Sequence, residues 1–159
     1  LSEINFIDHE YEGFFMKEAY RVPDTLYHSI LPGSVPKKMV PINHLPVRSF
    51  FTNLNQHDEL IVGRDYLLKG IAFDGGTGIK SVFFSEDDGK TWKETFLQED
   101  FGKYSFRQWI VPFTAKKKGE YKLVVRAVNK ENKTQPLTAV WNPGGYAQCK
   151  AEEVTIFAV

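Results

Sequence analysis

Turn signals between β-rich runs constrain the fold of this chain more than any other feature. In the stretch 66–92 (YLLKGIAFDGGTGIKSVFFSEDDGKTW), two apolar runs flank Asp74-Gly75-Gly76, and a third run follows Asp87-Asp88-Gly89-Lys90. Runs rich in Val, Ile, Phe and Tyr that are broken by Asp-Gly pairs are typical of a β-meander. Glycine fits such turns because a residue with a Cβ loses about 1–2 kcal/mol at positive φ.

Seven short runs with turn residues between them predict an all-β fold. They cover residues 47–51, 66–73, 79–85, 92–96, 105–111, 121–128 and 154–157. This number and spacing favour an immunoglobulin-like β-sandwich of the E-set type. In 79–85, Val82 and Phe84 share one face of the strand, and Phe83 shares the other with Ile79 and the serines. Since both faces carry an aromatic ring, we expect one face in the core and the other partly covered.

The first 46 residues differ from the rest in composition. Ile4 and Phe6 alternate with polar residues, which predicts a short strand. Residues 23–46 hold five of the eight prolines, which predicts an extended connector. We therefore expect three parts: a tail of a preceding domain at 1–22, a proline-rich connector at 23–46, and a sandwich at 47–159. The start at Leu1, without Met, is what a piece of a longer protein would show.

Charge and hydropathy exclude some classes of function. Lys plus Arg equals Asp plus Glu at 20 each, so the chain lacks the positive excess of a nucleic-acid-binding protein. The run Lys116-Lys117-Lys118 fits a solvated turn between strands. No run approaches the roughly 18 apolar residues of a membrane span.

The residues alone indicate no active site. Cys149 is the only cysteine and reads as a small hydrophobe, and the four histidines are not at ligand spacing. The glycine-rich stretch 74–78 lacks the Lys-Ser/Thr pair of a phosphate-binding loop, so we interpret it as a turn. The acidic stretch 86–88 lacks the alternation of a calcium loop and reads as a hairpin tip.

Five blocks in order resemble the C-terminal dimerisation domain of the sulfite oxidase family of molybdenum oxidoreductases. The blocks are LPVRS at 45–49, GIAFDGGTGI at 70–79, VFFSEDDGKTW at 82–92, RAVN at 126–129 with Gln135-Pro136, and WNPGG at 141–145. Each block is weak alone, but their order and distances over residues 41–159 are specific. The stretches GFFM at 13–16 and AYRVP at 19–23 also resemble the end of the family's catalytic domain.

The resemblance implies a subunit-association domain that forms a homodimer through a sheet face and has no catalytic, cofactor-binding or metal-binding residue of its own. It implies that molybdenum–molybdopterin is held by an upstream catalytic domain, because Cys149 does not match the family's cysteine ligand. Relatives place an oxyanion-binding arginine where this chain has Gly144. Trp141 and Asn142 either face the parent enzyme's substrate channel or serve as a core Trp and a turn Asn. Bacterial members are often periplasmic, which makes the periplasm a candidate compartment.

A free-standing immunoglobulin-like module that binds a carbohydrate or a protein surface is the alternative. Its contacts would be exposed rings such as those of Trp92, Tyr104 and Trp109. Burial of these rings in the core would argue against it.

Overall fold

The computed structural model describes residues 1–159, and the chain divides into two compact units. One unit comprises residues 1–43 and 140–148, and the other comprises residues 44–139 and 149–159. Neither helical segment of the chain has the length and apolar character of a bilayer-crossing helix.

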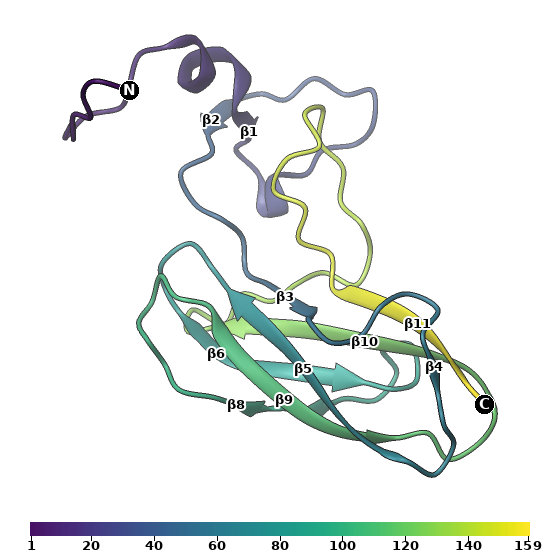
Figure 1. Ribbon diagram of the computed structural model, residues 1–159. Helices are drawn as coiled ribbons and strands as arrows, with labels where there is room; N and C mark the ends of the chain where they lie inside the picture. Colours follow the sequence, from purple (N-terminus) through teal and green to yellow (C-terminus); the bar gives the residue numbers. More distant parts are fainter. The chain divides into compact units, whose positions relative to one another are not determined.

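The first unit has little regular structure. It contains a π-helical turn, η1 (Phe15–Ala19), a 3-10 turn, η2 (Leu26–His28), and a two-stranded ribbon of β1 (Arg21–Pro23) with β2 (Met39–Pro41) (Figure 1). The predicted strand around Ile4 and Phe6 is wrong: this stretch forms no strand, and both side chains are exposed. A strand needs a hydrogen-bonded neighbour, and no other segment pairs with it.

Prolines limit the ribbon to two strands. Pro23 pairs with Met39, and Pro41 pairs with Arg21. Since a proline has no N–H to donate to a further strand, it is tolerated at an edge, and both strands of a ribbon are edges. The Arg21 guanidinium joins the two strands, because Nη2 donates to the Met39 carbonyl at 2.9 Å.

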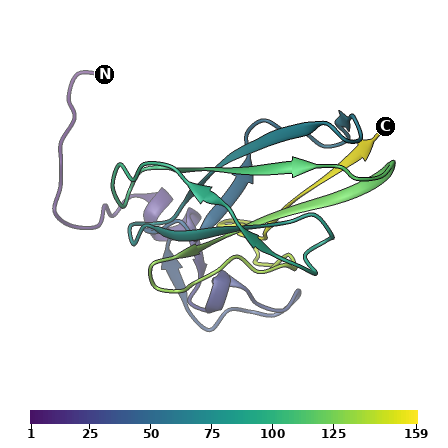
Figure 2. The ribbon, with the colours of Figure 1, turned by 90° about the horizontal axis from the view of Figure 1, so that it is seen from below.

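The second unit is an all-β sandwich, which confirms the predicted fold class. A five-stranded sheet has the order β4-β11-β10-β6-β7, and a four-stranded sheet has the order β3-β5-β9-β8 (Figures 1 and 2). The first consists of β4 (Glu59–Leu60), β6 (Ile79–Ser85), β7 (Lys93–Glu94), β10 (Gly119–Asn129) and β11 (Glu152–Ala158). The second consists of β3 (Arg48–Phe51), β5 (Asp65–Phe73), β8 (Phe96–Leu97) and β9 (Arg107–Thr114).

Aromatic rings form the centre of the core between the two sheets. Trp109 and Phe84 are fully buried, and Phe51 lies edge-on to both, with ring centroids 5.4 and 6.2 Å away. The buried indole is satisfied, because Trp109 Nε1 donates to Ser49 Oγ at 2.8 Å. Val82 also lies in the core, whereas Phe83 is half-buried.

The predicted strand at 92–96 is wrong in one respect, because the chain changes sheets within it. β7 pairs with β6 in the five-stranded sheet, and β8 pairs with β9 in the four-stranded sheet. Thr95, at the crossing, is 6% exposed, and its N–H donates to the Val82 carbonyl at 2.8 Å. The strand predicted at 105–111 runs on through Pro112 to Thr114. A proline is tolerated there because β8 pairs with β9 only at Trp109 and Ile110, so β9 is a free edge beyond them.

Candidate functional site

The outer face of the β3-β5-β9-β8 sheet is apolar. Leu68, Trp109 and Val111 point into the core, so the residues that alternate with them point outward. We call this surface the bare face; its apolar residues are Phe50, Leu67, Ile71, Phe73, Phe96, Phe106, Ile110 and Pro112.

Neighbouring strands join these side chains into one surface. Leu67 pairs with Pro112, and Ile110 pairs with Phe96. The Phe73 ring lies between those of Phe50 and Phe106, with centroids 6.3 and 5.4 Å away. Phe96, Phe106 and Leu67 are 64%, 58% and 47% exposed, respectively. Since a Phe side chain buries about 150–250 Å² when it is covered, such a surface is unusual for a chain that stays alone in water.

The outer face of the other sheet is polar and is covered by the chain itself. We call it the covered face; its outward residues include Phe83, Lys122, Val124, Arg126, Glu153, Thr155 and Phe157. Val124 points away from the core and yet is only 5% exposed. On the same face, the Arg126 guanidinium lies 4.1 Å from the centroid of the Trp92 ring, and Trp92 Nε1 donates to the Gly89 carbonyl at 2.9 Å.

Gln135 attaches the segment after β10 to the covered sheet. Its side chain is 1% exposed. Oε1 accepts the Ala127 N–H at 2.9 Å, and Nε2 donates to the carbonyls of Lys150 and Cys149 at 2.9 and 3.3 Å. The amide thus satisfies three backbone groups at a point where β11 has not yet begun and does not pair with β10.

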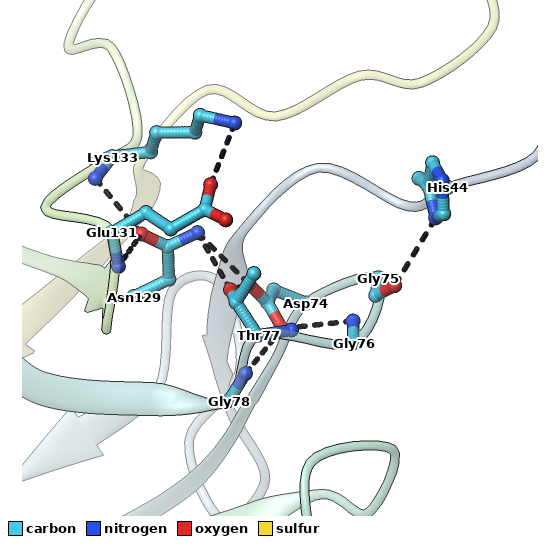
Figure 3. Close-up of polar contacts among 9 residues, drawn as sticks. All are labelled: His44, Asp74, Gly75, Gly76, Thr77, Gly78, Asn129, Glu131 and Lys133. Atoms are coloured by element: carbon cyan, nitrogen blue, oxygen red, sulfur yellow. Dashed lines mark hydrogen bonds and ion pairs between the residues drawn. The ribbon is translucent and has the colours of Figure 1, made fainter.

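The glycine-rich stretch 74–78 is a turn that its own aspartate fills. The Asp74 carboxylate accepts the N–H groups of Gly76, Thr77 and Gly78 at 3.1, 3.0 and 2.8 Å, the Thr77 hydroxyl, and the Asn129 amide at 2.9 Å (Figure 3). Burial alone would raise the pKa of Asp74, but these hydrogen bonds outweigh it and lower the pKa below its ordinary value. The N–H groups that a phosphate would need are therefore already used.

A second aspartate organises the hairpin tip between β6 and β7. Asp87 accepts the hydroxyl and the N–H of Thr91 at 2.7 and 2.8 Å, and the Ser85 hydroxyl at 2.7 Å. These bonds, those from Thr91 first, lower the pKa of Asp87 to about 2. The acidic stretch 86–88 is therefore a hairpin tip, as predicted, and Lys116-Lys117-Lys118 is an exposed connection between β9 and β10.

The rings proposed as ligand contacts do not share one surface. Trp109 is fully buried, and Trp92 is stacked against Arg126. Tyr104 is 76% exposed on the connection between β8 and β9. The three rings therefore form no stacking platform for a sugar.

The sequence of this sandwich matches a known protein family. Residues 39–151 match the family described as "Mo-co oxidoreductase dimerisation domain". The chain belongs to this family. The resemblance found in the sequence is thereby confirmed, and the chain is a dimerisation domain.

Two individual proteins are similar to this dimerisation domain. A sulfite oxidase from Arabidopsis thaliana is 28% identical in an alignment 159 positions long that covers 91% of this chain and 39% of the relative. The chain thus spans about two-fifths of the length of that relative. The crystal structure of the sulfane dehydrogenase SoxCD from Paracoccus pantotrophus superposes with a TM-score of 0.65 at 15% identity, over 89% of this chain and 36% of that one. At 15% identity, the similarity to the SoxCD structure shows a shared fold and nothing further.

Trp141 and Asn142, the two residues expected to face a substrate channel, lie in the first unit of the dimerisation domain. Asn142 is 3% exposed: its Nδ2 donates to the Tyr146 carbonyl at 2.9 Å, and its Oδ1 accepts the Tyr146 N–H at 3.2 Å. It therefore closes the loop that contains Gly144 and Gly145. Trp141 is 41% exposed, and its carbonyl accepts the Ile30 N–H at 3.0 Å. The role of the pair toward a substrate stays a prediction.

The side chains of the dimerisation domain do not fit a molybdenum cofactor. No three His, Cys, Asp or Glu side chains are grouped as metal ligands. Cys149 is 1% exposed, and burial raises the pKa of its thiol, although Arg48 acts in the opposite direction. A metal needs an accessible thiolate, and this position disfavours one.

Proposed function

We propose that the chain self-associates by packing its bare face against the bare face of a second copy. The observation that carries the proposal is the asymmetry of the sandwich. On one outer face the Trp92 ring lies against Arg126 and Val124 is 5% exposed, whereas the other face exposes eight neighbouring apolar side chains. Membership of a dimerisation-domain family supplies the kind of partner.

A two-fold arrangement suits this surface. A patch that meets its own copy is buried in both copies, so apolar side chains in its middle leave water twice for one contact. The positive side chains of Arg48 and Lys69 share the face with the rings. They can lie over apolar surface while the charged ends stay in water.

We further propose that the chain is the association part of a sulfite-oxidase-like oxidoreductase. In this proposal molybdenum–molybdopterin is held by another part of the parent protein, and Trp141 faces its substrate channel while Asn142 shapes the loop. Support comes from the similarity to a protein named sulfite oxidase. Gly144 stands where relatives place an arginine, so either another cation binds the oxyanion or the parent acts on another small oxo-compound. The coding sequence upstream of Leu1 tests this part: a start codon directly before it would contradict the proposal.

Sedimentation velocity on a dilution series of the chain tests self-association. We expect a dimer whose Kd lies near 1 μM, equivalent to about 8 kcal/mol. Ile110→Lys, in the centre of the bare face, should weaken it at least about 100-fold, because each copy would bring a charge into the apolar contact. Thr155→Lys is the matched control, since Thr155 is also half-buried and points outward, but on the covered face.

Two results would contradict the proposed surface. A wild-type chain that stays monomeric at about 100 μM does not self-associate by any face at the expected strength. Equal weakening by Ile110→Lys and Thr155→Lys would mean that the contact is not specific to the bare face.

A further inference from the structure

The connection between β8 and β9 exposes three aromatic rings. We call residues 98–106 the aromatic loop. Phe101, Tyr104 and Phe106 are 71%, 76% and 58% exposed, respectively. Three large rings that are mostly in water within six residues are costly for a loop unless another surface covers them.

The aromatic loop is stabilised by its own hydrogen bonds. Asp100 Oδ1 accepts the Gly102 N–H at 3.0 Å. The Ser105 N–H donates to the Gly102 carbonyl at 3.0 Å, and the Ser105 hydroxyl donates to the Phe101 carbonyl at 3.2 Å. The loop therefore presents its rings without the ordering cost that a flexible loop meets when it binds.

Ion pairs and one close contact fix the aromatic loop to the end of the sandwich. Asp100 Oδ2 lies 2.7 Å from Arg107 Nη1 and 3.4 Å from Lys130 Nζ. Lys130 follows β10, so Asp100 connects the loop to the other sheet. The Tyr104 ring lies against Gly76, where an added Cβ would be 2.6 Å from the ring.

We propose that the aromatic loop is an arm of the association surface that contacts the second copy, with Phe101 and Tyr104 as anchor residues. The proposal rests on the proposed function and adds residues that lie outside the sheet. The Phe106 ring, at the end of the loop, packs on Phe73 of the bare face, so the two apolar surfaces are continuous.

The chemistry of the aromatic loop fits a protein partner that is itself apolar. Aromatic rings on a preorganised backbone are the side chains that most often dominate binding free energy at protein interfaces. Lys103 lies with Nζ 4.8 Å from the centroid of the Tyr104 ring, which keeps its charge beside the ring. A second bare face, with its own half-exposed rings, supplies the apolar surface that Phe101 and Tyr104 lack.

The double variant Phe101→Ser/Tyr104→Ser tests the arm. We expect the dimer Kd of the 159-residue chain to increase about 10- to 100-fold in sedimentation velocity, with an unchanged thermal midpoint, because both rings are mostly in water. The matched control is Phe14→Ser/Phe15→Ser, which removes two neighbouring rings that are 62% and 60% exposed outside the sandwich. The control should leave the Kd unchanged.

A second variant separates loop conformation from ring contact. Asp100→Asn keeps both rings but weakens the ion pairs with Arg107 and Lys130. If the loop acts as a preorganised arm, the Kd should increase about 3- to 10-fold. Circular dichroism must show that each variant keeps the wild-type strand content.

The outcomes distinguish the two proposals. If the wild-type chain is a monomer, both proposals fail. If Ile110→Lys dissociates the dimer while Phe101→Ser/Tyr104→Ser leaves the Kd unchanged, the arm is refuted and the bare-face contact stands. If the loop variant and the Phe14→Ser/Phe15→Ser control weaken association equally, the arm is also refuted, because exposed rings in general would then be the cause.

Discussion

The two outer faces of the sandwich follow from the same strand alternation, but their apolar side chains are exposed to different extents. On the β6-β10-β11 side the chain folds over its own strands, so Val124 is buried although it points away from the core. On the β3-β5-β9 side Phe50, Ile71 and Ile110 also point away from the core and are half-exposed. The comparison teaches that equal strand alternation does not give equal exposure, and the more exposed apolar face is the one that we propose for association.

Among the variants that test the difference between the two faces, Val124→Lys should have the largest effect on stability. It places a charge at a position that is 5% exposed, so the free energy of unfolding should fall by about 3 kcal/mol or more. Ile110→Lys, the same change on the bare face, should lower it by less than about 1 kcal/mol in the monomer. Urea unfolding below the dimer Kd measures both, and equal losses would mean that the two faces are alike.

Gln135→Leu tests what attaches the covering segment. The substitution leaves the Ala127 N–H and the Lys150 and Cys149 carbonyls without their side-chain partner, at a cost of about 2–3 kcal/mol of unfolding free energy. Gln108→Leu, at an exposed glutamine of β9, should change the stability by less than about 0.5 kcal/mol. Similar losses of unfolding free energy in the two variants would mean that Gln135 does not attach this segment to the covered face.

Phe50→Ser tests the difference between the two faces through the affinity of the dimer. Phe50 packs against Phe73, and its loss should raise the dimer Kd about tenfold. Phe157→Ser is the control, because Phe157 lies on the covered face, stacked on His57 with centroids 5.9 Å apart. An analytical ultracentrifuge distinguishes them, and a larger effect from Phe157 would assign association to the wrong sheet.

Acid should affect the hairpin tip of the covered face with a small but specific signal. The hydrogen bonds from Thr91 and Ser85 lower the pKa of Asp87 to about 2 from 3.8. A lowered pKa means that this stabilisation is fully present above about pH 4 and is lost as the pH falls through about 2. The Thr91 amide resonance in NMR should titrate near pH 2, and Asp87→Asn should abolish that titration. A Thr91 midpoint near 4 would contradict the hydrogen-bonded geometry.

Much of the sandwich could be predicted because its signals are local. The alternation in 66–73, 79–85 and 121–128 gave strands that differ from β5, β6 and β10 by no more than two residues at either end. Asp74 and Asp87 mark turns because their carboxylates accept hydrogen bonds from groups only a few residues away.

What could not be predicted depends on contacts between distant segments. β4 is two residues long and exists only because it pairs in parallel with β11, about 100 residues later. The change of sheet at Thr95 follows from packing and not from any residue preference. From the sequence alone, Ile71 and Ile110 already indicate that the outer face of their sheet is apolar. The alternation of Lys122, Val124 and Arg126 does not indicate that the Trp92 ring will pack on the outer face of the other sheet. The sequence does not indicate which outer face pairs, whereas the geometry favours the β3-β5-β9-β8 sheet over the sheet that contains Phe83.

The outermost strands of both sheets are short, and this affects how copies of the chain can assemble. β4, β7 and β8 have two residues each and β3 has four, so the outermost strand at each margin offers only a short row of unpaired backbone groups. Two copies that pair edge to edge through these strands would gain few hydrogen bonds. Two copies that pack bare face against bare face would form a closed dimer. This geometry limits growth to a pair and disfavours an open fibre.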